Sequence, residues 1–421
     1  MSVPSNPRGT QDILPEEWPF WTHVIREAEE VARLFGYERI ETPTIADTEL
    51  FLRTNDEGTD VLKEMYTFQD RGGDSLTLRP EGTAPVVRAY LQHGMSRRPQ
   101  PVKLFYVEHM FRYERPQAGR FREHHQFGCE ALGVEDAYLD VEMIALLRTL
   151  YERLGLGDLR LQINSIGDRN CRPAYLDGLR AYLSERREAL APVDQERLAR
   201  NPLRVLDTKE ERSLPIVADA PSILDFLCED CRVHFERLRH GLDVLGIPYT
   251  INPTLVRGLD YYTRTVFEFY EEEHGAQLAV NGGGRYDALA EQLGGPPTPG
   301  IGFGLGIERV ILLLKERDIG PPVCPGPRVS LVHVGQGTED IAIRQAGRLR
   351  AAGIDAVMTF GDRSLRAQMR AANAAGSAYA VIIGPDEAAN GTVTIRSLRD
   401  GSQETVPESL LVEAVSGPPR L

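Results

Sequence analysis

Ten residues near position 320, Asp-Ile-Gly-Pro-Pro-Val-Cys-Pro-Gly-Pro (318–327), divide this chain into two parts. Six of the ten are glycine or proline, which interrupt helices and sheets, so the run is predicted to be a linker. A chain of 421 residues is long for one domain and sufficient for two or three. We therefore expect one domain over 1–322, the end of the linker over 323–327 and a second domain over 328–421.

The part after the linker alternates between strand and helix patterns. Ser364 is a suitable N-cap and Gly376 a suitable C-terminal stop for one of the helices. Such alternation is typical of a small α/β domain with a partly parallel sheet. Strands are predicted at 328–334, 354–360, 379–384 and 391–398, with helices at 339–351, at 364–375 and at the end of the chain.

The part before the linker shows hairpin-like strand pairs among helices, so its predicted fold class is α+β, an antiparallel sheet flanked by helices. Apolar residues recur at three-and-four spacing in 16–35, which predicts an amphipathic helix. Residues 170–250 are rich in Arg, Glu, Leu and Ala and are predicted to form a helical insertion. The other elements expected are strands at 37–43, 76–80, 102–107, 109–114, 124–131, 262–270 and 276–281, and helices at 82–93, 137–154, 286–293 and 306–317.

The composition is ordinary for a soluble globular protein, with 42% hydrophobic and 26% charged residues. The first residues lack the layout of a signal peptide, and no uncharged apolar run reaches the roughly 18 residues of a membrane span. The net charge of −14 argues only weakly against nucleic-acid binding, because a local basic surface is sufficient. Nearly all positive charges are arginines, which suit bidentate phosphate contacts.

Five cysteines are too few and too scattered for a disulfide framework, which fits a reducing cytosol. Cys228 and Cys231 form one Cys-x-x-Cys pair. A structural zinc site needs a second pair, which is missing, so both cysteines are predicted to be ordinary helix positions. No metal site is expected.

The first polar segment that suggests chemistry is Leu-Arg-Pro-Glu-Gly-Thr (78–83), which ends a strand and opens a helix. Glu81 and Thr83 are placed to accept hydrogen bonds from a substrate ammonium. The alternative is that Thr83 simply caps the helix, with a favourable acid in its first turn.

The second segment, 111–130, is predicted to run as strand, charged loop and strand. Arg112 and Glu114 would alternate onto one face of the first strand, and Gln126, Gly128 and Glu130 onto one face of the second. This polar face is either solvated or the floor of a polar pocket whose loop arginines reach for phosphates. The adjacent His124 and His125 point to opposite faces and make poor joint metal ligands.

Two further segments combine glycine with arginine. Arg257 precedes a glycine and is followed by Tyr261 and Tyr262, which are either plain core aromatics or part of a site. In Gly-Ile-Gly-Phe-Gly-Leu-Gly (300–306), alternate glycines leave one strand face bare for a flat ligand, and Arg309 follows in the next helix. The glycine spacing is not that of a dinucleotide fingerprint.

Together these segments resemble the class II aminoacyl-tRNA synthetases, specifically the histidyl-tRNA synthetase family, over essentially the whole chain. Residues 7–15 resemble its N-terminal signature, the helix and strand ending at Pro43 resemble motif 1, 112–114 with the following loop resemble motif 2, and 304–309 resemble motif 3. Arg-Gly-Leu-Asp-Tyr-Tyr-Thr (257–263) and Gly-Gly-Arg-Tyr-Asp (283–287) resemble its two histidine-specific signatures. The second domain resembles the class IIa anticodon-binding fold.

The resemblance implies that histidine is activated with ATP to histidyl-adenylate and then transferred to the 3′-terminal adenosine of tRNA(His). Arg257 and Arg112 would be catalytic, with Arg257 stabilising charge on the α-phosphate. The implied histidine contacts are Glu81, Gly82, Thr83, Arg112, Gln126, Glu130, Arg257, Tyr261 and Tyr262. The implied ATP contacts are Arg112, Glu114, Arg120, Gly304 and Arg309, with the loop residues Gln117, Arg120 and Arg122 as candidates for the tRNA acceptor end.

The resemblance also implies partners and a setting. ATP would enter as Mg-ATP, with no tightly bound metal or organic cofactor. Motif 1 implies a homodimer, and the expected location is the cytoplasm, without a membrane. The main alternative is the noncatalytic, synthetase-like regulatory subunit of ATP phosphoribosyltransferase, which generally lacks the anticodon domain and much of the catalytic set. Another class IIa synthetase is a further alternative that Arg257–Thr263 argues against.

Overall fold

The structure is a computed structural model that describes residues 3–54, 60–115, 119–257, 259, 261–273, 276–322 and 326–417. It divides into two compact units, Met1–Pro321 and Pro322–Leu421. None of the described helices is both long and apolar enough to cross a membrane.

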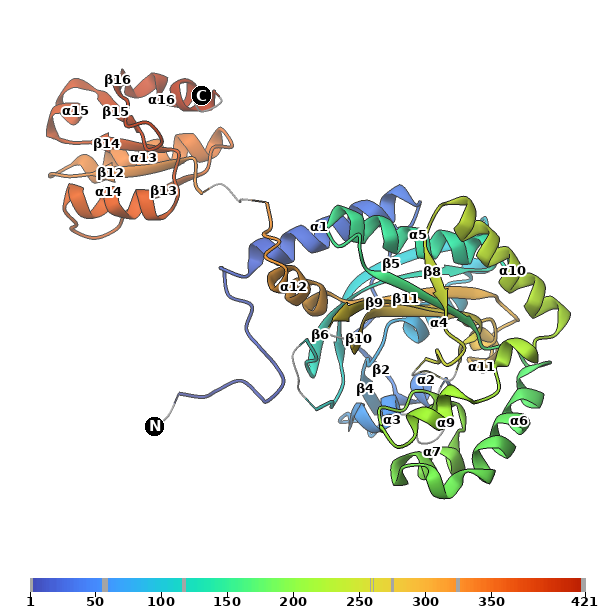
Figure 1. Ribbon diagram of the computed structural model, residues 1–421. Coiled ribbons are helices and arrows are strands. Elements are labelled where there is room, and N and C mark those ends of the chain that lie inside the picture. The colour runs from blue at the N-terminus through green and yellow to red at the C-terminus, as the bar shows by residue number, and fades with distance from the viewer. Residues whose placement is uncertain are drawn as a thin grey trace. The chain divides into compact units, whose positions relative to one another are not determined.

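The first unit is built on an eight-stranded sheet (Figure 1). The strand order is β1-β5-β6-β11-β10-β9-β7-β8, and every neighbouring pair is antiparallel except β1 with β5 and β7 with β8. The predicted α+β class is therefore confirmed. The strands are β1 (Glu38–Arg39), β5 (Val102–Phe111), β6 (Glu123–Leu132), β7 (Arg160–Ser165), β8 (Tyr249–Ile251), β9 (Thr263–Glu273), β10 (Ala276–Arg285) and β11 (Gly300–Gly306).

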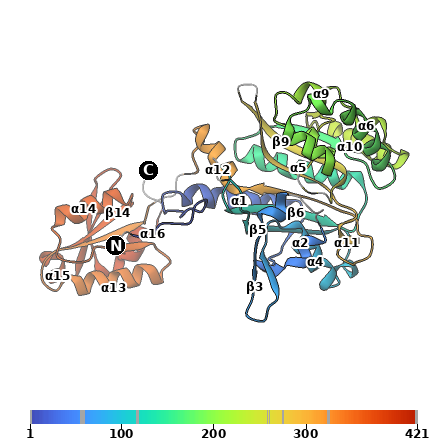
Figure 2. The same ribbon diagram turned by 90° about the horizontal axis from the view of Figure 1, so that it is seen from below.

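The two faces of this sheet are covered differently. Helices α1 (Trp18–Leu34), α5 (Ala137–Arg153), α10 (Glu229–Val244) and α12 (Ile307–Glu316) pack on one face, against Phe127, Cys129 and Ala131 of β6 (Figures 1 and 2). Helices α4 (Thr83–Gln92) and α11 (Leu289–Gln292) cover part of the opposite face. Side chains alternate along a strand, so the β6 residues that alternate with Phe127, Cys129 and Ala131 point to the opposite face of the sheet. Gln126 and Glu130 are among them.

Beside the main sheet lies a three-stranded sheet of order β2-β4-β3. Its strands are β2 (Ile45–Asp47), β3 (Tyr66–Gln69) and β4 (Ser75–Leu78), next to the short helices α2 (Thr48–Leu52) and α3 (Asp60–Glu64). The predicted strand over 37–43 is shorter than expected and is only β1, while β2 follows the predicted range and belongs to the other sheet.

The helical insertion leaves the sheet after β7 and returns at β8. It contains α6 (Arg172–Glu185), α7 (Pro192–Arg200), α8 (Leu203–Leu206), α9 (Leu214–Ala218) and α10 (Figure 1). The apolar side chains of α6 to α9 form a core of their own, whereas those of α10 belong to the core of the main sheet. Strand β8 overlaps the end of the range predicted to be helical, 170–250, and β7 was not predicted. The predicted strands 102–107 and 109–114 are one continuous strand that ends at Phe111, and the helix expected over 286–293 is only Leu289–Gln292.

The second unit has a five-stranded sheet of order β13-β12-β14-β15-β16, parallel among the first three strands and antiparallel beyond. The partly parallel sheet is as predicted, and β16 was not predicted. Ser364 caps α14 through a hydrogen bond to the backbone of Ala367. The elements are β12 (Val329–His333), α13 (Thr338–Ala351), β13 (Ala356–Met358), α14 (Leu365–Ala374), β14 (Tyr379–Ile383), α15 (Pro385–Asn390), β15 (Thr392–Ser397), β16 (Gln403–Pro407) and α16 (Leu411–Ser416).

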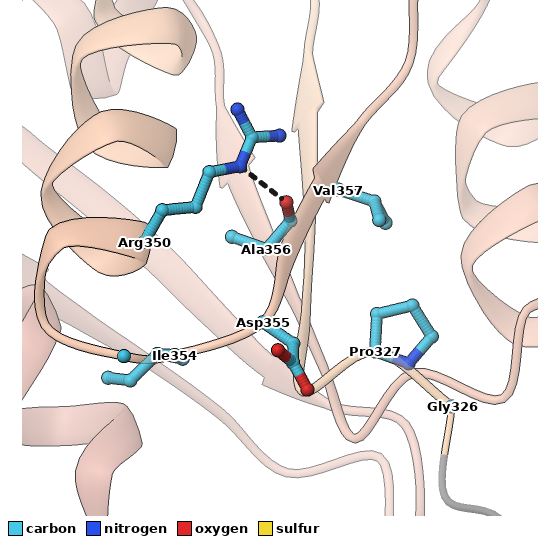
Figure 3. Close-up of a pocket in the computed structure, with 8 residues that line it drawn as sticks. Gly326, Pro327, Arg350, Ile354, Asp355, Ala356 and Val357 are labelled. Carbon is cyan, nitrogen blue, oxygen red and sulfur yellow. Dashed lines mark hydrogen bonds between the residues drawn. The ribbon is translucent and has the colours of Figure 1, made fainter. Parts of the chain in front are cut away.

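A pocket in the second unit lies where α13 turns into β13 (Figure 3). Arg350 donates to the carbonyl of Ala356 (2.9 Å) at its edge, and Asp355 and Pro327 line it. None of the residues proposed from the sequence for a site lines this pocket.

Candidate active site

Glu130 is the centre of a buried polar group on the second face of the main sheet. Its side chain is fully buried, and its Oε1 accepts hydrogen bonds from the hydroxyls of Thr83 (2.8 Å) and Tyr106 (3.3 Å). Its Oε2 accepts one from the hydroxyl of Tyr286 (2.5 Å). Burial raises the pKa of Glu130 to about 8, although these hydrogen bonds oppose the rise. Near pH 7 the carboxyl therefore holds a proton for much of the time.

Glu81 begins helix α4 beside this carboxyl. Its two oxygens accept from the backbone N–H groups of Thr83 (2.6 Å) and Ala84 (2.9 Å), so Glu81 caps the helix while Thr83 donates to Glu130. The alternative in which Thr83 is the cap is wrong, since the N-cap is Gly82 and it has no side chain to offer. Burial raises the pKa of Glu81 as well.

The glycines of β10 and β11 leave space that polar side chains of neighbouring elements fill. A Cβ at Gly302 would lie 1.7 Å from Oε2 of Glu130, and one at Gly304 would lie 1.7 Å from Nε2 of Gln126. A Cβ at Gly282, which pairs with Gly304, would lie 2.3 Å from the guanidinium of Arg257. The glycines therefore bring these polar groups onto one stretch of sheet, and Gln126 occupies the surface of Gly304 that was expected from the sequence to bind ATP.

Arg257, Tyr261 and Tyr262 approach this stretch from the segment before β9. Nη1 of Arg257 donates to Glu268 (2.6 Å). The rings of Tyr261 and Tyr262 lie 4.9 Å apart, and Tyr261 also contacts the ring of Tyr286 edge-on at 6.0 Å. Burial raises the pKa of Tyr262 to about 12 and also raises that of Tyr261. The hydroxyls of Tyr261 and Tyr262 therefore stay protonated and can donate hydrogen bonds.

Three polar atoms at this site are buried and have no hydrogen-bond partner within the described ranges. They are Oε1 of Gln126, Nε of Arg257 and the hydroxyl of Tyr261. A buried unpaired polar group costs roughly 1–3 kcal/mol, so such atoms mark a place where a polar ligand would be favoured. All three belong to residues proposed from the sequence as histidine contacts.

Arg112 and Glu114 lie just beyond the end of β5 and not within it, where the sequence pattern had suggested. Nε of Arg112 donates to the carbonyl of Pro80 (2.7 Å), next to Glu81. The carboxylate of Glu114 lies 3.8 Å from the guanidinium nitrogens of both Arg112 and Arg120. Arg112 is thereby held between the Glu81 turn and the loop that follows β5.

That loop also reaches the start of helix α12. The backbone of Gly119 lies against the side chain of Arg309, since a Cβ there would be 3.3 Å from its Cδ. Burial and then the positive charge of Arg120 lower the pKa of Arg309, and no carboxylate in the described part of the chain lies within 4.0 Å of its guanidinium. Arg120 has the carboxylate of Glu114 at 3.8 Å, so the two neighbouring guanidiniums share one nearby anion and suit a polyphosphate.

Of the two remaining loop residues, the structure describes Arg122. The guanidinium of Arg122 stacks on the ring of Tyr113 (3.7 Å) and donates to the carbonyl of Glu114 (3.2 Å), while its backbone N–H donates to the carbonyl of Gly9 (2.7 Å). Arg122 is thus engaged within the loop. Gln117 lies outside the described residues.

His124 and His125 lie on opposite faces of β6, as predicted. Burial and then Arg112 lower the pKa of His124 to about 3, whereas Nδ1 of His125 lies 2.8 Å from Glu308 on α12. The two rings therefore have separate surroundings and cannot share a metal ion.

Two tyrosines on Glu130 were not predicted from the sequence. Tyr106 sits in an apolar stretch of β5, and its ring fills the space above Gly82 and Gly128. No local signal marks it, because a tyrosine among apolar neighbours fits an ordinary core. Tyr286 lies in the 283–287 signature, so its segment was noted while its contact with Glu130 was not.

Arg285 of the same signature is structural. It is fully buried and pairs with Asp140 of α5 and with Asp287 (3.0 Å), and Asp140 also binds His234 of α10 (2.8 Å). This network joins β10 to two helices on the far face of the sheet.

Comparison with known proteins gives the following matches. A family model described as histidyl-tRNA synthetase matches residues 9–310, and one described as anticodon binding domain matches residues 328–417. A histidine–tRNA ligase of Dehalococcoides mccartyi is 50% identical over 408 residues, which cover 97% of this chain and 98% of that protein. One of Moorella thermoacetica is 51% identical, with 97% of each chain covered.

Solved structures agree with these matches. That of the apo histidyl-tRNA synthetase of S. aureus superposes with a TM-score of 0.84 at 38% identity, covering 98% of this chain and all of that one. A chain of Bacillus halodurans named as an ATP phosphoribosyltransferase regulatory subunit/histidyl-tRNA synthetase gives 0.65 at 23% identity, covering 90% and 97%. The second likeness shows the fold alone.

Proposed function

Because this chain belongs to the histidyl-tRNA synthetase family and is a histidine–tRNA ligase, we propose that it activates histidine with ATP on the sheet face around Glu130. The histidine carboxylate attacks the α-phosphate of ATP, which gives histidyl-adenylate and pyrophosphate. A ribose hydroxyl of the 3′-terminal adenosine of tRNA(His) then attacks the histidyl carbonyl and releases AMP. The regulatory-subunit alternative is not favoured, since a 51% identical relative over 97% of each chain is a ligase and the second unit matches the anticodon-binding family.

The single observation that carries the placement of the site is the set of unpaired buried atoms on Gln126, Arg257 and Tyr261. They lie on the same stretch of sheet as Glu130, to which three hydroxyls already point. Oε1 of Gln126 and the hydroxyl of Tyr261 would accept from the histidine ammonium, beside Glu81 and Thr83. Nε of Arg257 would donate to the carboxylate or to the phosphate that it attacks.

Glu130 would recognise the imidazole. With a pKa of about 8 and three hydroxyl donors fixing its oxygens, the carboxyl can either donate to a ring nitrogen or accept from a ring N–H. A buried site built to hydrogen-bond the ring rejects analogues that leave the group unpaired. Tyr261 and Tyr262 would enclose the ring.

The arginines would bind the nucleotide. Arg112 and Arg257 would contact the reacting carboxylate and α-phosphate, and fixed positive charge there stabilises the charge that develops in the transition state. Arg309 and Arg120 would bind the distal phosphates, and Glu114 the adenine amino group. ATP would enter with Mg²⁺, which neutralises phosphate charge when bound.

The test is histidine-dependent ATP–pyrophosphate exchange in Arg257→Ala. We expect exchange to fall about a hundredfold or more, because a preorganised cation at the α-phosphate is worth that much. Arg180→Ala, which removes an exposed arginine of α6 whose only ion pair within the described ranges is with Asp177, is the matched control and should retain full exchange. An active enzyme that is unaffected by Arg257→Ala would refute the role of this arginine.

The loop is tested separately. If Arg120 mainly contacts the tRNA acceptor end, Arg120→Ala should leave exchange intact and impair charging of tRNA(His). Equal loss of both activities would assign Arg120 to ATP alone.

Further parts of the proposal concern assembly. Residues 1–322 would catalyse, 328–421 would bind the anticodon, and the motif 1 region around α1 and β1 would form a cytoplasmic homodimer. Exposed apolar side chains at the two ends of α1 support an interface there, namely Trp18 and Leu34. Light scattering should give twice the chain mass of 47.0 kDa, and a monomer would refute the dimer.

A further inference from the structure

Four side chains that the proposed active site does not use meet where the helical insertion joins the main sheet. Their ligand atoms all lie within 4.8 Å of one another, and we call them the cysteine cluster: Asp168, Cys171, Cys228 and Cys231. The sequence supplies them as two pairs of the form ligand-x-x-ligand, 60 residues apart. One pair follows β7 and the other begins α10, so the fold brings together what the sequence separates.

The distances within the cluster are those of a tetrahedral metal site. Sγ of Cys171 lies 3.8 Å from Sγ of Cys231, and Oδ1 of Asp168 lies 3.4 Å and 3.8 Å from Sγ of Cys171 and of Cys228. A zinc ion with Zn–S bonds of about 2.3 Å and a Zn–O bond of about 2.0 Å has S···S edges of about 3.8 Å and S···O edges of about 3.5 Å. A disulfide would need sulfurs about 2.05 Å apart, and all three cysteines are free.

The backbone is shaped around these sulfurs. Gly167 has a positive φ of 64°, and a Cβ at this position would lie 2.7 Å from Sγ of Cys171. The backbone N–H of Asp168 donates to the same sulfur (3.3 Å), which favours a thiolate. Cys171 and Cys228 are the N-caps of α6 and α10, so two helix N-termini direct positive partial charge at the cluster.

Burial and charge also fit a bound cation. Cys171 and Cys231 are buried, whereas Asp168 and Cys228 are partly exposed, which leaves an access route from solvent. A guanidinium nitrogen of Arg264 lies 3.9 Å from Oδ2 of Asp168 and offsets part of the negative charge that three thiolates and a carboxylate would keep around a divalent ion.

We propose that the cysteine cluster binds a structural Zn²⁺ that closes the base of the helical insertion. Three thiolates and one carboxylate are a four-coordinate donor set suited to zinc, without an open position. Binding displaces one proton from each cysteine thiol into solvent. No metal was expected from the sequence because it contains one cysteine pair, whereas Asp168 and Cys171 supply the second pair of ligands.

This site adjoins the proposed histidine pocket. Arg172, the residue after Cys171, donates to the carbonyls of Tyr262 (2.6 Å), Ile166 (3.0 Å) and Gly167 (3.1 Å). The turn that carries two ligands therefore also holds the backbone of a tyrosine proposed to enclose the imidazole. Loss of the metal should therefore weaken the binding of histidine and also destabilise the fold of the helical insertion.

The test is the zinc content of the full chain after exposure to Zn²⁺ and removal of free ions, measured by mass spectrometry of the metal. We expect about one zinc per chain, a loss of at least about tenfold in Cys171→Ser and in Cys231→Ser, and full content in the control Cys324→Ser. Co²⁺ in place of zinc should give the visible absorption of a tetrahedral thiolate site in the wild type and lose it in both cluster variants.

Asp168→Cys keeps the proposal testable if the serine variants fail to fold. This variant has four cysteine ligands. A higher concentration of chelator should be needed to remove zinc from it than from the wild type. A folded wild type that takes up no zinc, that holds only iron, or whose zinc content the cluster variants leave unchanged would overturn the proposal. So would a Cys171–Cys231 disulfide found by peptide mapping of the active enzyme.

Discussion

Replacing Glu130 with glutamine should change how the stability of the catalytic unit depends on pH. The carboxyl is fully buried, and burial raises its pKa to about 8 from an ordinary 4.5. In the unfolded chain the proton is lost near pH 4.5, whereas the folded chain keeps it to about pH 8. Between these values the unfolded state binds fewer protons, so the free energy of unfolding falls by about 1.4 kcal/mol for each pH unit of increase.

The difference between the two pKa values corresponds to about 5 kcal/mol of unfolding free energy. This contribution is lost completely once the pH has risen through the pKa of the folded group. Glutamine does not titrate, and its amide can still pair with the hydroxyls of Thr83 and Tyr286. Because a domain of this size shifts its Tm by roughly 2 °C per kcal/mol, Glu130→Gln should gain roughly 5–8 °C over the wild type between pH 5 and pH 8.

Scanning calorimetry at several pH values measures this difference, and the subtraction of the two curves cancels the other titrating groups. Glu185→Gln changes an exposed glutamate at the end of α6 and should give a curve parallel to the wild type. The same Glu130→Gln variant should lose about 2- to 10-fold in kcat/KM for histidine near pH 7, because a hydrogen bond between neutral groups is worth about 0.5–1.5 kcal/mol. Parallel pH curves for Glu130→Gln and the wild type would refute the buried, protonated carboxyl.

Three other outcomes follow from contacts already described. Gly302→Ala places a Cβ 1.7 Å from the Glu130 carboxylate and should reduce exchange at least about a hundredfold, while Gly347→Ala, with nothing within 4 Å, should leave it unchanged. Arg309→Ala should raise the KM for ATP about tenfold in exchange assays and leave the KM for histidine unchanged. Arg285→Met removes one partner of a buried ion pair and should lower the unfolding free energy by about 3–5 kcal/mol in urea titrations.

The sequence predicted best where one periodicity controlled one element. The two-residue period of β6 is sufficient to assign Gln126 and Glu130 to one face, because side chains alternate along any strand. The α+β class and the partly parallel sheet of the second unit followed from the same kind of pattern. Strand β8 has only three residues within a helical region, and so short a strand leaves no periodic signal.

What the sequence did not predict depends on contacts between distant segments. Tyr106 and Tyr286 reach one carboxyl from positions 180 residues apart in the chain. Tyr106 has only apolar neighbours in sequence, and the 283–287 signature marks the segment of Tyr286 without indicating a contact with Glu130. The cysteine cluster was missed for the same reason, since its two halves are joined only when α6 and α10 begin side by side. That Gly304 contacts ATP stays a prediction, and the strand face that looked bare in the sequence has the side chain of Gln126 beside it.

The glycine-lined stretch of β10 and β11 also limits how the enzyme could be re-engineered. Pockets are usually enlarged by trimming side chains, but Gly282, Gly302 and Gly304 have none to remove, and any replacement there displaces Arg257, Glu130 or Gln126. Substitutions at these glycines can therefore only make the pocket smaller. Room for a bulkier histidine analogue has to come from the aromatic walls, so selection for such analogues should return substitutions among the tyrosines and leave these glycines untouched.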